Sequence, residues 1–127
     1  EASDCGAIVS IGTTASLEAF AGASPYGAMK AALLNYFGNL AQELAPVGIR
    51  VNSVSPGPIY FEGGAWENIR AAMPEFYDST VAMIPSGRMG SPEEVCVQVA
   101  LLLSPLSAYT TGTNVVIDGG FTKRIQF

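Results

Sequence analysis

Residues 25–57 read PYGAMKAALLNYFGNLAQELAPVGIRVNSVSPG and join a helix pattern to a strand pattern. Ser24 is a typical N-cap and a first-turn proline follows it, after which apolar residues recur at helical spacing. This pattern predicts a helix over 25–45, ended by a nearby proline and glycine. The apolar run at 49–57 closes with a Pro-Gly turn and predicts a buried strand. The stretch therefore supplies the second half of a βαβ unit.

The residues before this stretch supply the first half of the unit. Residues 6–12 form a short apolar run bracketed by glycines, which is typical of a strand buried on both faces of a parallel sheet. Residues 13–23 are rich in Thr, Ser, Ala and Gly without periodicity, so they predict a loop. This loop follows the carboxyl end of the strand, which is where open α/β sheets bind ligands.

The rest of the chain continues the alternation of helices and strands. Residues 58–90 are broken by glycines and prolines, with one or two short helices around 66–73, and an insertion of this length is typical of a substrate lobe. A capping box at its start predicts a helix over 91–103. Residues 113–120 predict a last strand, closed by a glycine pair. The fold class is therefore α/β, with residues 1–127 in one domain.

Composition narrows the kinds of function that the chain can have. Apolar residues make up 49% and charged residues 13%, which favours a compact core over disorder. The net charge of −5 and the scattered basic residues argue against binding to nucleic acid. No apolar run is long enough to span a membrane, and no leader-like segment opens the chain, so we expect it in the cytoplasm.

The types of side chain limit the possible chemistry further. The sequence has no His, which excludes Ser-His-Asp hydrolysis and His-ligated metals. Cys5 and Cys96 lie far apart without a CxxC partner, so we expect two free thiols and no metal site. Any acid or base must therefore be Tyr, Lys, Cys, Asp or Glu.

Tyr26 and Lys30 are the side chains best suited to acid/base chemistry. Residues four apart on a helix share a face, so both can reach the mouth left by the preceding strand and loop. A phenol is a poor proton donor or acceptor at neutral pH, but a cation a few ångström away favours its phenolate form. The alternative is a helix face that carries the two groups by chance.

Consecutive segments of the chain resemble, in order, the short-chain dehydrogenase/reductase family. The strand and loop that carry the family's catalytic hydroxyl are matched by GAIVSIGTTAS, and its YxxxK helix is matched by YGAMKAAL. The strand and Pro-Gly turn that close over the nicotinamide are matched by GIRVNSVSPGPI. The last helix and strand are matched by GRMGSPEEV and LLLSPLSAYTTGTNVVIDGG. The resemblance covers essentially the whole chain and implies the carboxyl-terminal half of a Rossmann-like, doubly wound parallel sheet.

The resemblance implies hydride transfer between a nicotinamide cofactor, NAD or NADP, and a carbonyl or secondary alcohol. Tyr26 would exchange the proton with the substrate oxygen, while Lys30 would hold the cofactor's ribose hydroxyls and favour the phenolate form of the tyrosine. Thr13 would hydrogen-bond the substrate oxygen, with Thr14 as the reserve candidate. The backbone that faces the cofactor would belong to Pro56, Gly57 and Ile59.

The chain departs from the family pattern at several side chains. Thr13 stands where the family usually has Ser, and Gly12 stands beside it where another Ser is common. Phe61 stands where a Thr commonly contacts the carboxamide, and it belongs to a group of aromatic residues in the irregular lobe. These aromatic residues are Tyr60, Phe61, Trp66, Phe76 and Tyr77. They indicate either an apolar substrate pocket, with Tyr60 as the best candidate, or the packing of a small lobe.

The largest departure is the absence of a Gly-rich phosphate loop, since neither GxxxGxG nor GxGxxG occurs. The residue that selects NAD or NADP is missing with it. We therefore expect this chain to be inactive alone and to come from an enzyme about twice as long. The resemblance also implies a homo-oligomer, since the final segment lies near a subunit interface in that family. The alternatives are a partial fold that self-associates without catalysis, and a binding or regulatory protein that keeps the fold.

Overall fold

A three-stranded parallel sheet forms the centre of the computed structural model, which describes residues 6–20 and 22–125. Its strands are β1 (Gly6–Ile11), β2 (Ile49–Pro56) and β3 (Asn114–Ile117), in the order β1-β2-β3. Both neighbouring pairs are parallel, with Ile11 opposite Val54 at the carboxyl end of β1. The α/β class predicted from the sequence is confirmed.

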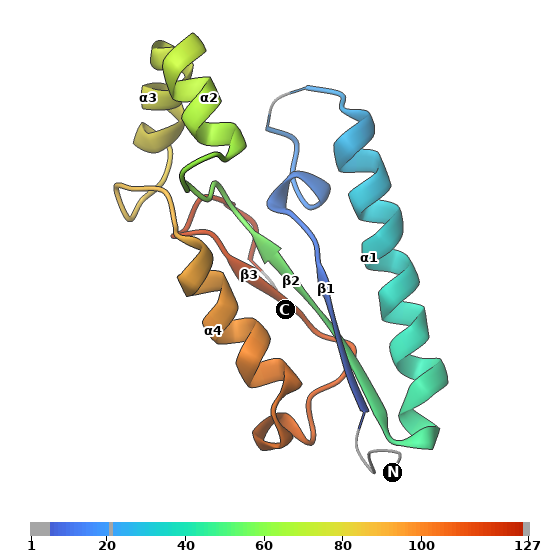
Figure 1. Cartoon of the computed structure of the whole chain (residues 1–127). Helices are drawn as coiled ribbons and strands as arrows, with labels where there is room; N and C mark the ends of the chain where they lie inside the picture. Colours follow the sequence, from blue (N-terminus) through green and yellow to red (C-terminus); the bar gives the residue numbers. More distant parts are fainter. Residues whose placement is uncertain (1–5, 21, 126–127) are drawn as a thin grey trace.

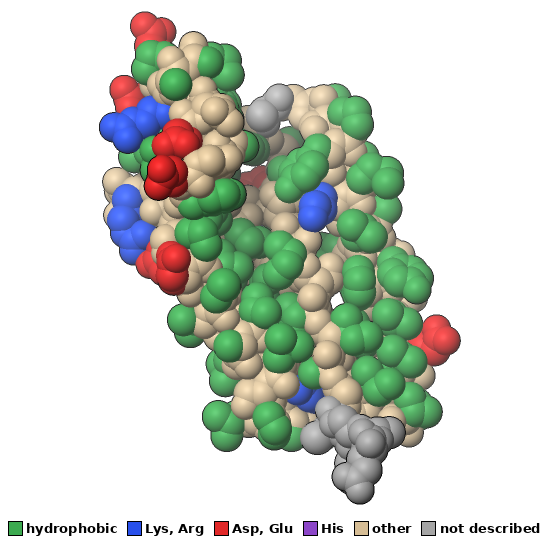
Figure 2. All heavy atoms as spheres, in the orientation of Figure 1, with side chains coloured by type: hydrophobic (Ala, Val, Ile, Leu, Met, Phe, Trp, Pro, Cys, Tyr) green, Lys and Arg blue, Asp and Glu red, His purple; other side chains and the backbone are tan. Residues whose placement is uncertain are grey.

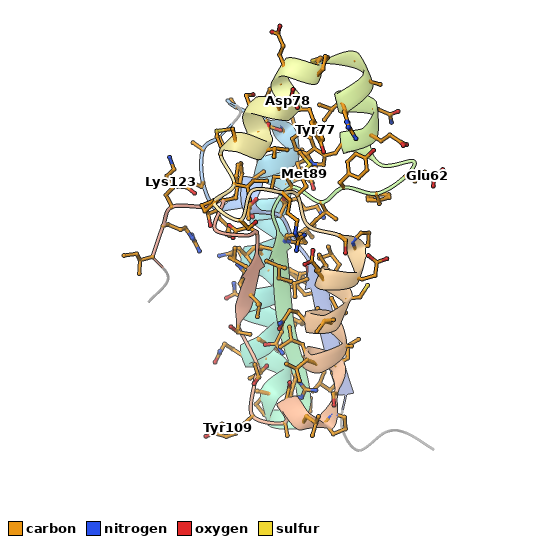
Figure 3. The ribbon with its side chains drawn as sticks, turned by 90° about the vertical axis from the view of Figure 1, so that its left-hand side faces the viewer. Glu62, Tyr77, Asp78, Met89, Tyr109 and Lys123 are labelled. Atoms are coloured by element: carbon orange, nitrogen blue, oxygen red, sulfur yellow. The ribbon has the colours of Figure 1, made fainter. Side chains whose placement is uncertain are left out.

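Two long helices cover opposite faces of this sheet, α1 (Pro25–Leu44) on one and α4 (Pro92–Leu103) on the other (Figure 1). The turned view in Figure 3 shows the strands between them. The Ser24 hydroxyl caps α1 by accepting a hydrogen bond from the Gly27 N–H at 3.5 Å. Both predicted helices are confirmed, with ends that differ by one residue from the expected ones.

β2 is the central strand and carries the most buried residues of the sheet. Val51 and Val54 have no exposed surface, and Asn52 is 2% exposed. The Asn52 amide donates to the Thr110 carbonyl at 2.9 Å and accepts from the Thr113 N–H at 3.1 Å. This buried side chain therefore fixes the segment that leads into β3 against the middle of the sheet.

Arg50, also on β2, holds the carboxyl end of α4. Its guanidinium donates to the carbonyls of Leu102 at 2.7 Å and of Ser104 at 3.1 Å. The last carbonyls of a helix lack partners within the helix, and a cation there complements the helix dipole. Arg50 thus joins the central strand to the helix that covers it.

Two short helices form a lobe beyond the carboxyl ends of the strands (Figure 1). They are α2 (Ala65–Ala72) and α3 (Pro74–Ala82). The sequence predicted one or two short helices around 66–73, and the helical region extends to Ala82 because Pro74 ends α2 and begins α3. The buried centre of the lobe comprises Ile84, Met89 and Phe121, with Tyr60, Trp66, Tyr77 and Val81 packed against it.

Arg88 and Glu94 form an ion pair where α4 begins. The guanidinium donates to both carboxylate oxygens, at 2.6 and 2.9 Å, and the carboxylate also accepts from the Ser91 N–H at 2.9 Å. The hydrogen bond from Arg88, followed by that from Ser91, lowers the pKa of Glu94 to about 2. The capping contact predicted for this helix is therefore reinforced by a charge partner.

We expect Glu94→Gln to destabilise the protein slightly at neutral pH and not at low pH. The folded-state pKa of Glu94 lies below the ordinary value of 4.5, so its contribution is fully present above that pH and is lost as the pH falls towards about 2. Denaturant unfolding of wild type and variant between pH 7 and 3 measures the difference. A difference that stays constant over this range would show that the carboxylate charge contributes nothing.

None of the helices in the described part of the chain is long and apolar enough to cross a membrane. Within the same residues, no three His, Cys, Asp or Glu side chains gather as a metal site would require. Cys96 is free and exposed, whereas Cys5, the other thiol expected from the sequence, lies outside the described residues.

Candidate active site

A cavity of about 700 Å³ lies where β1 and β2 end, between the start of α1 and the lobe. Figure 2 shows the surface hollowed between these two parts, with acidic and basic side chains gathered mainly on the lobe. The walls come from the segment after β1, the first turn of α1, the turn after β2, helix α2 and Phe121. The site therefore occupies the carboxyl edge of the sheet, as the sequence predicted for a ligand.

Tyr26 and Lys30 lie on consecutive turns of α1 at this edge. Tyr26 lines the cavity and is 57% exposed. The Lys30 Nζ donates to the carbonyl of Ile11 at 2.8 Å and lies 5.9 Å from the centroid of the Tyr26 ring. The last residue of β1 thus fixes the ammonium beside the phenol, while further N–H donors of the ammonium remain for a bound group.

Thr13 and Thr14 both line the same cavity. Thr13 caps the short 3-10 turn η1 (Thr14–Ser16), and its Oγ1 accepts from the Ala15 N–H at 3.3 Å. Because that oxygen acts as the acceptor in this bond, the hydroxyl proton can donate elsewhere. Thr14 is 5% exposed. The better exposed hydroxyl therefore belongs to Thr13, which is the first choice from the sequence.

Two glycines allow the close approach that brings these groups together. A Cβ on Gly27 would lie 2.9 Å from the carbonyl oxygen of Ala15, so only a glycine lets the helix start pack against the turn after β1. A Cβ on Gly12 would lie 2.9 Å from the Ser55 Oγ and 3.2 Å from the Val54 carbonyl oxygen. The glycine found in place of the family's serine therefore suits this closely packed strand end.

The turn after β2 contributes backbone to the cavity. Gly57 and Ile59 line it, whereas Pro56 is the last residue of the strand and does not. The N–H groups of Gly57 and Tyr60 donate to carbonyls of neighbouring segments, both at 2.9 Å. Within residues 6–20 and 22–125, the N–H of Ile59 has no acceptor. This turn therefore offers one free donor beside the cavity.

The two aromatic residues predicted for the substrate pocket lie elsewhere. Ile59 lines the cavity, whereas Tyr60 packs in the lobe, with its ring 6.1 Å from that of Tyr77. Phe61 is 48% exposed and does not line the cavity either. The lobe supplies Trp66 instead, from the first turn of α2.

Glu18, Phe20 and Phe121 are among the cavity residues that were not identified from the sequence. The rings of Phe20 and Phe121 meet edge to face, with centroids 4.8 Å apart. These residues come from segments at opposite ends of the chain, and no local pattern links them. Their pairing appears only in the folded molecule.

Asp118 organises the turn that delivers Phe121 to the cavity. Its carboxylate accepts from the Gly120 N–H at 2.9 Å and from the Thr122 N–H and hydroxyl at 2.8 and 2.7 Å. Burial raises the pKa of Asp118, but these hydrogen bonds together outweigh it, so the pKa lies below its ordinary value. The turn also explains why β3 ends at Ile117 and not at the expected residue 120.

The sequence of this chain matches a family model and known enzymes. A family model described as enoyl-(acyl carrier protein) reductase matches residues 1–122. Isoepoxydon dehydrogenase from Aspergillus clavatus is 46% identical over 102 residues, which make up 80% of this chain and 39% of that protein.

Two solved structures share the fold. The NADPH-bound structure of a short chain oxidoreductase from Pseudomonas aeruginosa is 29% identical, with a TM-score of 0.80 over 94% of this chain and 47% of that one. A 3-oxoacyl-[acyl-carrier protein] reductase with bound NAD from Brucella melitensis is 31% identical, with a TM-score of 0.79 over 92% of this chain and 41% of that one. The chain spans less than half the length of each of these proteins.

Proposed function

Because this chain belongs to the short-chain dehydrogenase/reductase family, we propose that it carries the catalytic residues of an NAD(P)-dependent oxidoreductase. The reaction is hydride transfer between the nicotinamide and the carbon of a ketone, aldehyde or secondary alcohol. The observation that carries this proposal is that Tyr26 and Thr13 line one cavity, with the Lys30 ammonium 5.9 Å from the Tyr26 ring.

The residues around the cavity fit a flat ring that bears a carboxamide. Pro58 and Ile59 offer an apolar surface, and the Ile59 N–H is a donor without an acceptor in the part of the chain that the structure describes. Such a donor suits a carboxamide oxygen, which is a hydrogen-bond acceptor. When bound, the nicotinamide supplies or takes up the hydride. NAD and NADP both fit these residues, and the two solved relatives contain NADPH and NAD.

Each of the three side chains has a separate part in the proton chemistry. In the reducing direction, the Tyr26 hydroxyl gives its proton to the substrate oxygen, and in the oxidising direction it takes the proton back. The Thr13 hydroxyl donates a hydrogen bond to the same oxygen while negative charge develops there. Lys30, anchored on the Ile11 carbonyl, places a positive charge beside the phenol and binds the ribose hydroxyls of the cofactor.

The proposal is tested by following the hydride itself. The protein at the full length of its relatives is mixed with a ketone and with reduced cofactor deuterated at the transferable position. We expect an alcohol that carries one deuterium on its carbinol carbon, detected by mass spectrometry. An alcohol without deuterium, or no alcohol from protein that binds the cofactor, would contradict hydride transfer at this site.

A further inference from the structure

One acidic residue lines the candidate active-site cavity. Among the described residues that line the cavity, Glu18 is the only Asp, Glu, Lys or Arg. It follows η1 on the segment between β1 and α1 and is half-buried. The remaining lining side chains are apolar or carry hydroxyl groups. Any charged group on a ligand in this cavity would therefore meet a negative charge.

The walls of this cavity are mostly aromatic and apolar. Phe20, Phe121 and Trp66 line the cavity with it, and Ile69 adds an aliphatic surface from the same helix as Trp66. Such walls exclude water once a ligand has bound, and the effective dielectric constant falls. Interactions between charges are then much stronger than in bulk water. The carboxylate can therefore influence which ligands bind.

A backbone contact holds Glu18 in place. Its carboxylate oxygens accept from the Lys123 N–H at 3.0 and 3.4 Å, which joins the segment after β1 to the carboxyl-terminal segment. In the described part of the chain, Glu18 forms no ion pair with a Lys or Arg. One amide hydrogen bond does not cancel the charge of a carboxylate, so Glu18 keeps a negative charge beside this cavity and beside the smaller one that it lines with Lys123.

We propose that Glu18 makes the cavity select carbonyl substrates that have an apolar body and no negative charge. This inference rests on the proposed oxidoreductase function and adds the class of substrate to it. A carboxylate or phosphate on the substrate would be repelled at close range by a fixed like charge, with no described cation in the wall to compensate. Neutral ketones and aldehydes carry no charge for Glu18 to repel, and their apolar bodies can pack on the aromatic walls.

The test uses two probes of nearly equal shape, para-acetylbenzamide and para-acetylbenzoate, which differ in charge. Their binding to the full-length protein is measured through the fluorescence of Trp66, the only Trp among these 127 residues. A Trp66→Phe variant identifies the part of the signal that comes from the cavity. Glu18→Gln removes the charge but keeps an oxygen that can accept from the Lys123 N–H.

Glu62→Gln is the matched control. It removes the same charge from an exposed residue that does not line the cavity and that points away from the body of the molecule (Figure 3). We expect wild type and Glu62→Gln to bind the amide at least about tenfold more tightly than the acid. In Glu18→Gln the affinity for the acid should rise until most of this preference is lost, while the affinity for the amide stays the same.

Four results would overturn the inference: equal binding of both probes to wild type, an unchanged preference in Glu18→Gln, the same loss of preference in Glu62→Gln, or no binding of either probe. Because the readout is binding, it is independent of hydride transfer. A preference for the amide without deuterium transfer would refute the proposed function and leave the charge selection standing. Deuterium transfer to both probes, bound with equal affinity, would refute the charge selection and leave the proposed function standing.

Discussion

Tyr26→Phe is expected to lower kcat by about two to four orders of magnitude, because it removes the proposed acid and base and leaves the ring in place. Tyr26 is 57% exposed and makes no hydrogen bond with the described residues, so the fold should not depend on its hydroxyl. The affinity for reduced cofactor, measured by its fluorescence, should remain close to that of wild type. Steady-state turnover of a neutral ketone measures the loss.

Tyr36→Phe is the control for this experiment. Tyr36 lies on the same helix, is 59% exposed and does not line the cavity, so the same chemical change there should leave kcat unaltered. Turnover that survives in Tyr26→Phe would remove the tyrosine from the reaction. An equal loss in both variants would point to a general effect on the helix.

Asn52→Ala is expected to reduce the free energy of unfolding by about 2–4 kcal/mol, since two buried groups lose their partners at once. The Thr110 carbonyl and the Thr113 N–H pair with the Asn52 amide inside the structure, where water cannot easily replace it. Denaturant unfolding of the full-length protein gives the difference. The proposed catalytic side chains lie beyond the carboxyl end of β1, whereas Asn52 lies in the middle of β2, so kcat of the folded variant should change little.

Asn39→Ala provides the comparison on an exposed helix face. The Asn39 amide donates to the Asn35 carbonyl at 2.9 Å, but water can replace this contact, and alanine favours the helix. We expect a change of less than about 0.5 kcal/mol. If Asn52→Ala were as harmless as Asn39→Ala, the buried amide would have no stabilising role.

The sequence predicted the elements of the fold because each has a local signal. The apolar runs that form β1 and β3 have glycines close to their ends. A serine stands immediately before both α1 and α4, and each helix begins with a proline. The pairing of Tyr26 with Lys30 follows from helical spacing alone, and the structure adds the anchor on Ile11 that spacing cannot supply. Local patterns therefore predict elements and the residues within one element.

The walls of the cavity were harder to predict, because they depend on contacts between distant segments. Phe20 meets Phe121, and Glu18 meets Lys123, across almost the whole length of the chain. The aromatic residues of the lobe were recognised as a group, but which of them lines the cavity depends on how the turn after β2 and helix α2 pack in the folded molecule. Neither is encoded in spacing or composition.

The parallel sheet also has a consequence for the order of folding. Gly6 pairs with Ile49, and Ser53 pairs with Asn114. Each pair of strands therefore joins residues that are far apart in the sequence. Pairings of this kind form slowly, because a long loop must close before any contact compensates for the lost entropy. The cavity needs Thr13 from before the first crossover and Phe121 from after the last strand. The cavity should therefore be among the last parts of the molecule to form. During refolding, ligand binding should appear later than the formation of the helices.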